Sequence, residues 1–456
     1  MVCQGLGKNL QHRRSAFLRR HHHLKNHYTT NHCMTDYNEL TPYKDAINQC
    51  VRCGACQAHC PVYDQARQEG AVARGKLALA KALLEESVTI DSRLEEDVSL
   101  CLMCGSCVVK CPNKVPTDKI VGAMRREISN RKGLSLTGKT VAALTGHPPL
   151  LKALVKTADV LSPVLFKKVP QTSGLRLRFP VSGHAQRTLP AVASKNLFTE
   201  LPEFIQGRPD KPVVGLFAGC AITYIYPKIG VAMASLLNHL GYSVFTPRTQ
   251  GCCGIPARST GDTKLIEQLN RTNLEAFKAH EVAYIVTGCA SCHSGIGETD
   301  LNSTEEQADF AGKVREIHQF LYQEGLADTL AALPTTKERT RITYHDPCHL
   351  KTKGIINEPR ALLQSLPNTH YEEMENSDLC CGLGGSFSAH HYAYSKAIGQ
   401  RKVAGIKASE AELLATACPG CMLQLQDSIN HAMLNVQTIH ILELISKALA
   451  LDQKWK

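Results

Sequence analysis

Eighteen of the twenty cysteines in this 456-residue chain fall into four ordered groups. Two groups share the pattern Cys-x-x-Cys-x-x-Cys-x-x-x-Cys-Pro, and the other two share a single Cys, a later Cys-Cys-Gly and a final Cys-x-x-Cys. Cysteines this close in sequence usually bind one metal centre through their thiolates. The groups are Cys50, Cys53, Cys56 and Cys60; Cys101, Cys104, Cys107 and Cys111; Cys220, Cys252, Cys253, Cys289 and Cys292; and Cys348, Cys380, Cys381, Cys418 and Cys421.

The first two groups have the spacing of bacterial two-cluster ferredoxins, in which the Cys before Pro ligates the other cluster. Gly54 and Gly105 would let the backbone pass close to the cluster sulfides. Structural zinc is the alternative, although zinc sites usually use two separated Cys pairs. The spacing therefore predicts cluster I on Cys50, Cys53, Cys56 and Cys111, and cluster II on Cys101, Cys104, Cys107 and Cys60.

The Cys-Cys-Gly groups are harder to interpret from spacing alone. Five thiols exceed what one zinc ion or one cubane cluster needs, so the fifth would bridge irons or stay free for chemistry. A redox dithiol at Cys289/Cys292 or Cys418/Cys421 is the competing interpretation. His345 and His349 flank Cys348, where they would donate hydrogen bonds to a cluster or cap a helix.

The elements that must position these cysteines differ between the two halves of the chain. Residues 34–130 predict a mostly α-helical domain, with helices over 74–86 and 93–102. Residues 131–210 predict a helical segment and an extended connector. Residues 211–335 and 336–456 form a repeat, because Cys348 follows Cys220 by 128 positions and Cys418 follows Cys289 by 129.

Each repeat alternates apolar runs with helical segments, which predicts a small parallel α/β sheet. Every cysteine would then lie beyond the C-terminal end of a strand, the edge at which open α/β sheets build their sites. Residues 133–140 match the phosphate-binding loop pattern, but 120–132 predict a helix where that loop needs a strand, so we do not predict nucleotide binding. No other flavin or nicotinamide motif is present, so the chain lacks a hydride acceptor of its own.

Charge and hydropathy limit the partners. Six of the 52 basic residues and none of the 41 acidic ones lie in residues 1–33, so without them the net charge falls from +11 to +5. We expect 1–33 to be a disordered or non-native tail, with Met34 the natural start, and we expect no nucleic-acid partner. No run of eighteen apolar residues exists. Residues 141–169 predict helices packed on the first domain, or a membrane-surface anchor, in a protein of the cytoplasm or the inner face of its membrane.

The pattern Cys-x31-Cys-Cys-x35/36-Cys-x-x-Cys resembles the cysteine-rich "CCG" domain of heterodisulfide reductase. A two-cluster ferredoxin domain followed by two CCG domains resembles the iron–sulfur subunit of glycolate oxidase and D-lactate dehydrogenase. The anaerobic glycerol-3-phosphate dehydrogenase iron–sulfur subunit is similar in layout. The resemblance covers nearly everything from residue 40 onward and is carried by residues 50–61, 74–76, 101–112, 219–220, 251–254, 345–349 and 379–382.

The resemblance implies a multidomain fold, with an α-helical ferredoxin domain followed by two repeated α/β CCG domains. It implies two [4Fe-4S] clusters in the first domain and one further cluster, of noncubane [4Fe-4S] type, on the five Cys of each CCG domain. It also implies an FAD-containing partner subunit, a quinone or similar acceptor, and no catalytic acid or base in this chain. Both five-Cys sets are complete, whereas copies in glycolate oxidase are often degenerate. A disulfide or thiol reductase function therefore stays open.

Overall fold

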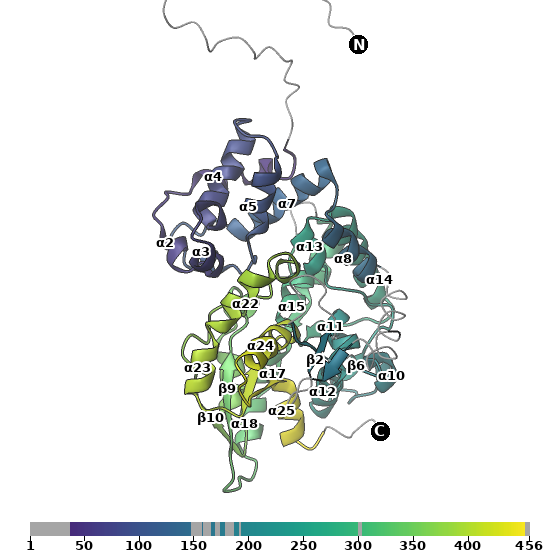
Figure 1. Cartoon of the computed structure of the whole chain (residues 1–456). Helices are drawn as coiled ribbons and strands as arrows, with labels where there is room; N and C mark the ends of the chain where they lie inside the picture. The colour runs from purple at the N-terminus through teal and green to yellow at the C-terminus, as the bar shows by residue number, and fades with distance from the viewer. Residues whose placement is uncertain are drawn as a thin grey trace, which may run out of the picture. The chain divides into compact units, whose positions relative to one another are not determined.

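A computed structural model describes residues 37–146, 157, 166–168, 174–177, 187–190, 193–299 and 303–451 (Figure 1). The basic tail over 1–33, the expected start at Met34 and most of the 141–169 stretch lie outside these residues. Across the described part of the chain, no helix is both long and apolar enough to cross a bilayer.

The first part of the described chain, purple to blue in Figure 1, is helical as predicted. Alanine and leucine, which favour helices, dominate α4, and its Leu77 and Leu83 are buried in the core of this domain. Asp91 caps α5, because its carboxylate accepts a hydrogen bond from the backbone N–H of Leu94 at 2.8 Å. The elements are the 3-10 turns η1 (Thr41–Tyr43) and η2 (Glu69–Ala71) and the helices α1 (Lys44–Asn48), α2 (Ala55–Ala58), α3 (Pro61–Ala66), α4 (Ala73–Leu84), α5 (Ser92–Ser99), α6 (Ser106–Val109) and α7 (Thr117–Lys132).

The segment between the helical domain and the first repeat contains more structure than the expected connector. It forms α8 (Leu136–Gly146), a small antiparallel sheet of β1 (Phe166–Lys168), β2 (Gly174–Leu177) and β3 (Leu189–Pro190), and α10 (Leu197–Glu200). Residues 133–140 follow α7 and run into α8, so the strand that a phosphate-binding loop requires is absent here.

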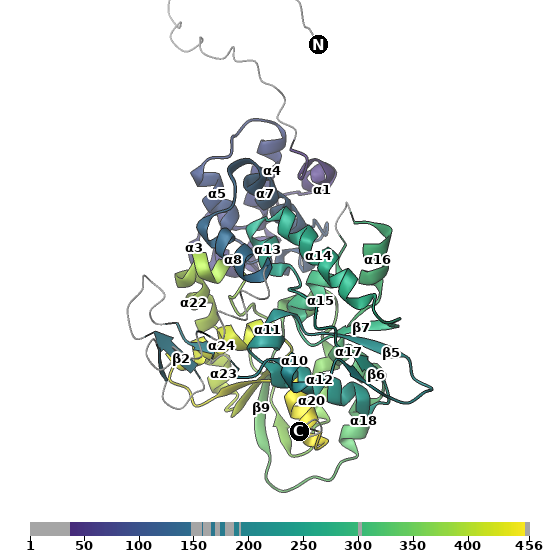
Figure 2. The same cartoon turned by 90° about the vertical axis from the view of Figure 1, so that its right-hand side faces the viewer.

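The first repeat forms a five-stranded sheet in the order β4-β6-β5-β7-β8, whose strands β5, β6 and β7 lie together in Figure 2. All pairings are parallel except that of β4 with β6. Because β4 precedes residue 211, this sheet begins earlier than the predicted boundary. The strands are β4 (Phe204–Ile205), β5 (Val213–Phe217), β6 (Ser243–Phe245), β7 (Tyr284–Thr287) and β8 (Val314–Glu316). The helices are α11 (Gly219–Tyr224), α12 (Pro227–His239), α13 (Ile255–Thr260), α14 (Thr263–Phe277), α15 (Ala290–Gly297), α16 (Glu305–Gly312), α17 (Ile317–Gln323) and α18 (Leu326–Ala331).

The second repeat forms a fully parallel sheet in the order β10-β9-β11-β12. The parallel α/β prediction is therefore confirmed in this copy and, apart from β4, in the first. The strands are β9 (Thr340–His345), β10 (Thr369–Tyr371), β11 (Leu413–Thr416) and β12 (Gln437–His440). The helices are α19 (Cys348–Lys351), α20 (Asn357–Gln364), α21 (Phe387–His390), α22 (Tyr392–Gln400), α23 (Val403–Ala408), α24 (Pro419–His431) and α25 (Ile441–Ala448).

The two repeats pack on each other through two equivalent helix–helix contacts. Helix α12 of the first copy packs on α25 of the second, and α17 of the first packs on α20 of the second. In the repeat, α12 corresponds to α20 and α17 corresponds to α25. The same contact is therefore made twice in opposite senses, as at an interface with two-fold symmetry. One continuous apolar core, with Leu237, Leu321, Leu362 and Ile445 among its buried residues, runs through both copies.

Arg125 ties the helical domain to the first repeat. Its buried guanidinium donates to the backbone carbonyl of Cys101 at 2.7 Å and to that of Ser259, at the end of α13, at 3.0 Å. It also donates to the carbonyls of Val98 and Ser99 at the end of α5. One charged side chain thus satisfies carbonyl groups of two domains. Losing it would leave the carbonyls of Val98 and Cys101 without a donor among the described contacts. The carbonyl of Ser99 also accepts from the N–H of Cys101, and that of Ser259 from the hydroxyl of Ser386.

We expect Arg125→Met to lower the free energy of unfolding by about 3 kcal/mol, because charged hydrogen bonds to buried carbonyls are lost. The measurement is the thermal unfolding midpoint of the protein kept under anaerobic conditions. Arg93→Met is the control, since Arg93 is 71% exposed and pairs only with Asp97 among the described contacts. Equal midpoints for the two variants would contradict the role of Arg125.

Candidate iron–sulfur centres

Two neighbouring cavities in the helical domain sort its eight cysteines into the predicted sets. Cys50, Cys53 and Cys56 of the first motif line one cavity together with Cys111. The thiols of the second motif line the other together with Cys60. Cys107 reaches both cavities. The last Cys of each motif therefore crosses to the other cavity, so each cavity has the four thiols that a [4Fe-4S] cluster takes. That these thiols ligate clusters stays a prediction.

Turns and helix ends position these thiols. Gly54 and Gly105 precede α2 and α6 with φ of 84° and 68°, a backbone conformation that other residues adopt only with strain. Cys60 is the N-cap of α3, and its sulfur accepts a hydrogen bond from the backbone N–H of Tyr63 at 3.4 Å. Such N–H groups stabilise the added negative charge when a cluster is reduced.

Burial contributes to a raised pKa at three thiols of the second cavity, those of Cys60, Cys104 and Cys107, so they are costly to ionise without a cation. Burial, with smaller contributions from the neighbouring Cys104 and Cys101, raises the pKa of Cys60 to about 12. Iron bound at this cavity would supply the positive charge that stabilises these thiolates. Lys76 adds a buried cation nearby, and its ammonium donates to the carbonyls of Gly70 and Asp97 at 2.6 and 2.5 Å.

The first CCG set gathers at the C-terminal edge of its sheet. The sulfurs of Cys220 and Cys252 are 3.9 Å apart, and Cys252 is almost fully buried. A side chain at Gly219 would place its Cβ 2.8 Å from the sulfur of Cys292, so only glycine fits there. The thiol of Cys292 contacts those of Cys253 and Cys289, and with burial these contacts raise the pKa of Cys292 well above its ordinary value.

The second CCG set has the same layout with a different neighbour. The sulfurs of Cys381 and Cys421 are 3.4 Å apart, and Cys348 contacts Cys380. A ring nitrogen of His345 lies within 4.8 Å of the sulfurs of Cys381 and Cys421. Burial, helped by the charge of Lys402, lowers the pKa of His345 well below its ordinary value, so the ring is neutral. The ring of His345 makes no hydrogen bond to a helix end within the described structure, and ring Nδ1 of His349 lies 3.2 Å from the hydroxyl of Ser291.

Each copy holds the loop before its Cys-Cys-Gly with one buried polar side chain from a following segment. In the first copy, Asn273 accepts from the N–H of Gly251 and donates to the carbonyl of Cys252, both at 2.8 Å. In the second copy, Lys402 donates to the carbonyls of residues 376, 377 and 379 at 2.7–3.0 Å. Neither residue was predicted from the sequence, although the repeat offset of 129 relates them.

The cysteine sets contact one another in an order that differs from their order along the chain. Cys104 of the second cavity contacts Cys380 of the second CCG set, which together with burial raises the pKa of Cys104 well above its ordinary value. Cys418 of the second CCG set contacts Cys289 of the first. The second CCG set therefore lies between the ferredoxin cavities and the first CCG set.

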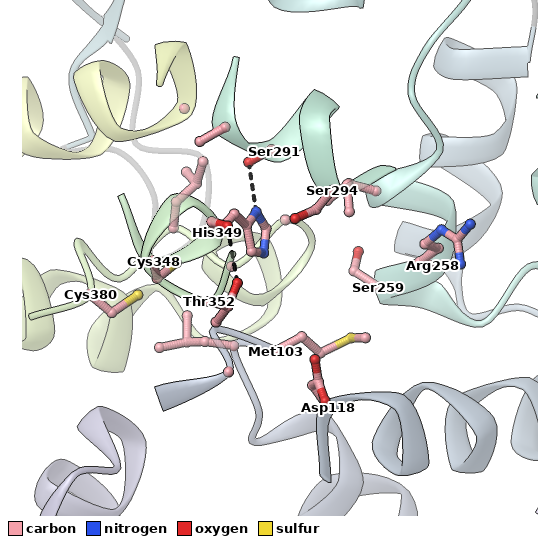
Figure 3. A pocket seen from close by; sticks show the side chains of 18 of the residues that line it. Met103, Asp118, Arg258, Ser259, Ser291, Ser294, Cys348, His349, Thr352 and Cys380 are labelled. Carbon is pink, nitrogen blue, oxygen red and sulfur yellow. Dashed lines mark hydrogen bonds between the residues drawn. The ribbon is translucent and has the colours of Figure 1, made fainter. Parts of the chain in front are cut away.

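A pocket lined by residues of all three domains includes all five thiols of the second CCG set, so a cluster held by these thiols would occupy part of it (Figure 3). Met103 and Asp118 come from the helical domain, Arg258 and Ser291 from the first repeat, and His349 from the second. Ser291 and His349 face each other in the figure, with 3.2 Å between the hydroxyl oxygen and ring Nδ1. A small molecule in this pocket would lie close to Cys348 and Cys380.

Comparison with known proteins agrees with this architecture. A family model described as a 4Fe-4S dicluster domain matches residues 46–115, and a cysteine-rich domain model matches residues 214–297 and 342–426. The probable glycolate oxidase iron–sulfur subunit of Bacillus subtilis is 30% identical, covering 91% of this chain and 96% of the relative. One subunit of the dihydromethanophenazine:CoB–CoM heterodisulfide reductase of Methanosarcina barkeri is 26% identical, covering 89% of this chain and 95% of the relative. Lactate utilization protein A of Geobacillus kaustophilus is 30% identical over 51% of this chain and 98% of its own length.

The crossed arrangement of the ferredoxin thiols predicts which cysteine variants lose the same cluster signal. We expect Cys60→Ser to lose the same paramagnetic signal as Cys101→Ser, because both thiols line one cavity. Cys111→Ser should instead share its loss with Cys50→Ser. The measurement is the electron paramagnetic resonance spectrum of the reduced protein, with iron content as the control for assembly. If Cys60→Ser matched Cys50→Ser, each motif would hold its own cluster and the crossing would be wrong.

Proposed function

This chain belongs to the family of glycolate oxidase iron–sulfur subunits, and on that premise we propose that it is the electron-transfer subunit of a flavin-dependent 2-hydroxy acid dehydrogenase. A partner subunit containing FAD oxidises the acid to the 2-oxo acid, which releases two electrons and two protons. Glycolate is the first candidate substrate and D-lactate the second. The electrons pass singly through this chain to a quinone or similar acceptor.

The observation that carries the proposal is the unbroken contact between successive thiol sets. Cys107 lines both ferredoxin cavities, Cys104 contacts Cys380, and Cys289 contacts Cys418. Iron–sulfur clusters bound at these sets would supply centres that accept and release one electron each. Transfer of single electrons between such centres breaks no bond in a substrate, so no acid or base is needed along this path.

The ligand sets support four centres. The two ferredoxin cavities fit one [4Fe-4S] cluster each, and each CCG domain offers five thiols for one further cluster. The noncubane type that the resemblance implies is consistent with these sets, because adjacent cysteines such as Cys380 and Cys381 can hardly both bind one iron.

A second candidate function is a disulfide reductase. Both five-Cys sets are complete, and His349 joins the thiols of the second set in lining one pocket, which favours this candidate. Cleavage of a disulfide there would take two electrons from the chain and two protons, and it would release two thiols.

The test uses the chain in complex with its FAD-containing partner under anaerobic conditions. We expect glycolate or D-lactate to bleach the iron–sulfur absorption of the complex, whereas the chain alone responds to neither acid. Cys380→Ser should slow reduction of a quinone by at least about tenfold while the partner's flavin is still reduced, because the middle of the path is interrupted. Met433→Ala is the control, because Met433 is an exposed sulfur-containing side chain of the second repeat and belongs to none of the four groups.

Two outcomes would contradict the proposal. Oxidation of either acid by the isolated chain would place a substrate site in this chain. Rapid reduction of a small disulfide by the dithionite-reduced chain, with no transfer from the flavin partner, would favour the second candidate.

A further inference from the structure

The two CCG copies differ at one buried position that faces their thiols. His345 ends β9 three residues before Cys348, and Phe217 ends β5 three residues before Cys220. Both side chains are fully buried. The second set therefore has an imidazole where the first has a hydrocarbon ring.

His345 has no protein partner for its ring. Both ring nitrogens are buried, and neither makes a hydrogen bond within the described structure. The hydroxyl of Thr416 donates to the backbone carbonyl of His345, which holds the strand and leaves the ring unsatisfied. A buried ring N–H without an acceptor is unfavourable, so an unsatisfied group of this kind requires an explanation.

The closest candidates for an acceptor are sulfurs. A ring nitrogen, the sulfur of Cys381 and that of Cys421 all lie within 4.8 Å of one another. That separation is too long for a direct hydrogen bond. A cluster held by these thiols would bring further sulfur atoms into the same space and could accept the ring N–H.

Charge alone does not distinguish the two copies. Lys402 acts electrostatically on Cys381 and Cys380 in the second copy, and Arg258 acts on Cys253 in the first. One cation therefore lies near each set. The ring N–H of His345 is the difference that points to the thiols themselves.

We propose that His345 donates a hydrogen bond to a sulfur atom of the cluster held by the second CCG domain, and that this makes the centre easier to reduce than that of the first CCG domain. A hydrogen bond to cluster sulfur stabilises the reduced form, which carries one more negative charge. The inference rests on the proposed function, since it requires a cluster at these thiols. His345 is a positioning residue that touches no substrate.

The position of the second CCG set determines which neighbouring centres its higher reduction potential affects. It contacts the ferredoxin thiols through Cys380 and the first CCG set through Cys418. A centre of higher potential there draws electrons from the neighbouring centres on both sides. Electrons held at this centre are then close to His349, which lines the same pocket as the thiols of the second CCG set.

The test is a redox titration of the assembled protein followed by electron paramagnetic resonance. Cys220→Ser and Cys421→Ser identify the signals of the first and second CCG centres. We expect His345→Phe, which copies the residue of the first repeat, to lower the reduction potential of the second centre only, with the iron content unchanged. His345→Gln keeps an N–H donor and should restore part of the shift.

Tyr344→Phe is the matched control. Tyr344 is the neighbouring residue of β9, is equally buried, and also has a polar atom without a hydrogen-bond partner in the described structure. Successive side chains of a strand point to opposite faces, so removing this hydroxyl should leave both potentials unchanged. If His345→Phe fails to fold, His345→Leu removes the same donor with a smaller side chain.

An unchanged potential in His345→Phe at full iron content would overturn the inference. Loss of the second cluster from the Phe and Gln variants alike would also overturn it, because His345 would then be a ligand. Neither result touches the proposed function, which fails only if the wild-type complex does not reduce its clusters with the 2-hydroxy acid.

Discussion

The gathering of eighteen thiols into four groups, with nine of the thiols buried, is the constraint on which the rest of the structure depends. Sulfurs as near as 3.4 Å for Cys381 and Cys421 cannot all be ionised in a protein interior without positive charge between them. Bound iron would supply this positive charge, and the protein supplements the charge with buried cations and backbone N–H groups. Lys76 lines the second ferredoxin cavity and bonds carbonyls of η2 and α5, whereas Lys402 lies near the second CCG set and bonds carbonyls of the loop that precedes Cys380.

Parallel sheets suit this requirement because they bring several chain segments to one edge. The strands β5 and β7, or β9 and β11, end side by side, and the cysteines that follow them meet without long loops. The helical domain brings its cysteines together in a different way. Each motif begins a helix at a glycine turn, and the last Cys of each motif lines the cavity of the other motif. The helical domain meets the second repeat where Cys104 contacts Cys380, and Arg125 joins it to the first repeat close to Cys101.

Much of this could be predicted from the sequence, since the signals are local. The periodicity over 74–86 and the apolar run before Cys220 predict α4 and β5, and the ferredoxin spacing predicts the thiols that share each cavity. The spatial order of the sets could not be predicted, because it arises from contacts between residues far apart, such as Cys104 and Cys380. The short strand β4 pairs with β6 about 40 positions later, so its place in the sheet is equally non-local.

The reciprocal packing of α12 on α25 and of α17 on α20 makes the core of each repeat depend on the presence of the other repeat. Each repeat completes its core with helices of the other, so a polypeptide carrying a single repeat would leave both apolar surfaces open to solvent. Two such polypeptides could cover these surfaces by pairing about the same axis. The internal duplication thus places within one chain the reciprocal packing that a two-fold symmetric dimer would make. The two halves differ in sequence at equivalent positions, and His345 of the second repeat occupies the buried position that Phe217 occupies in the first.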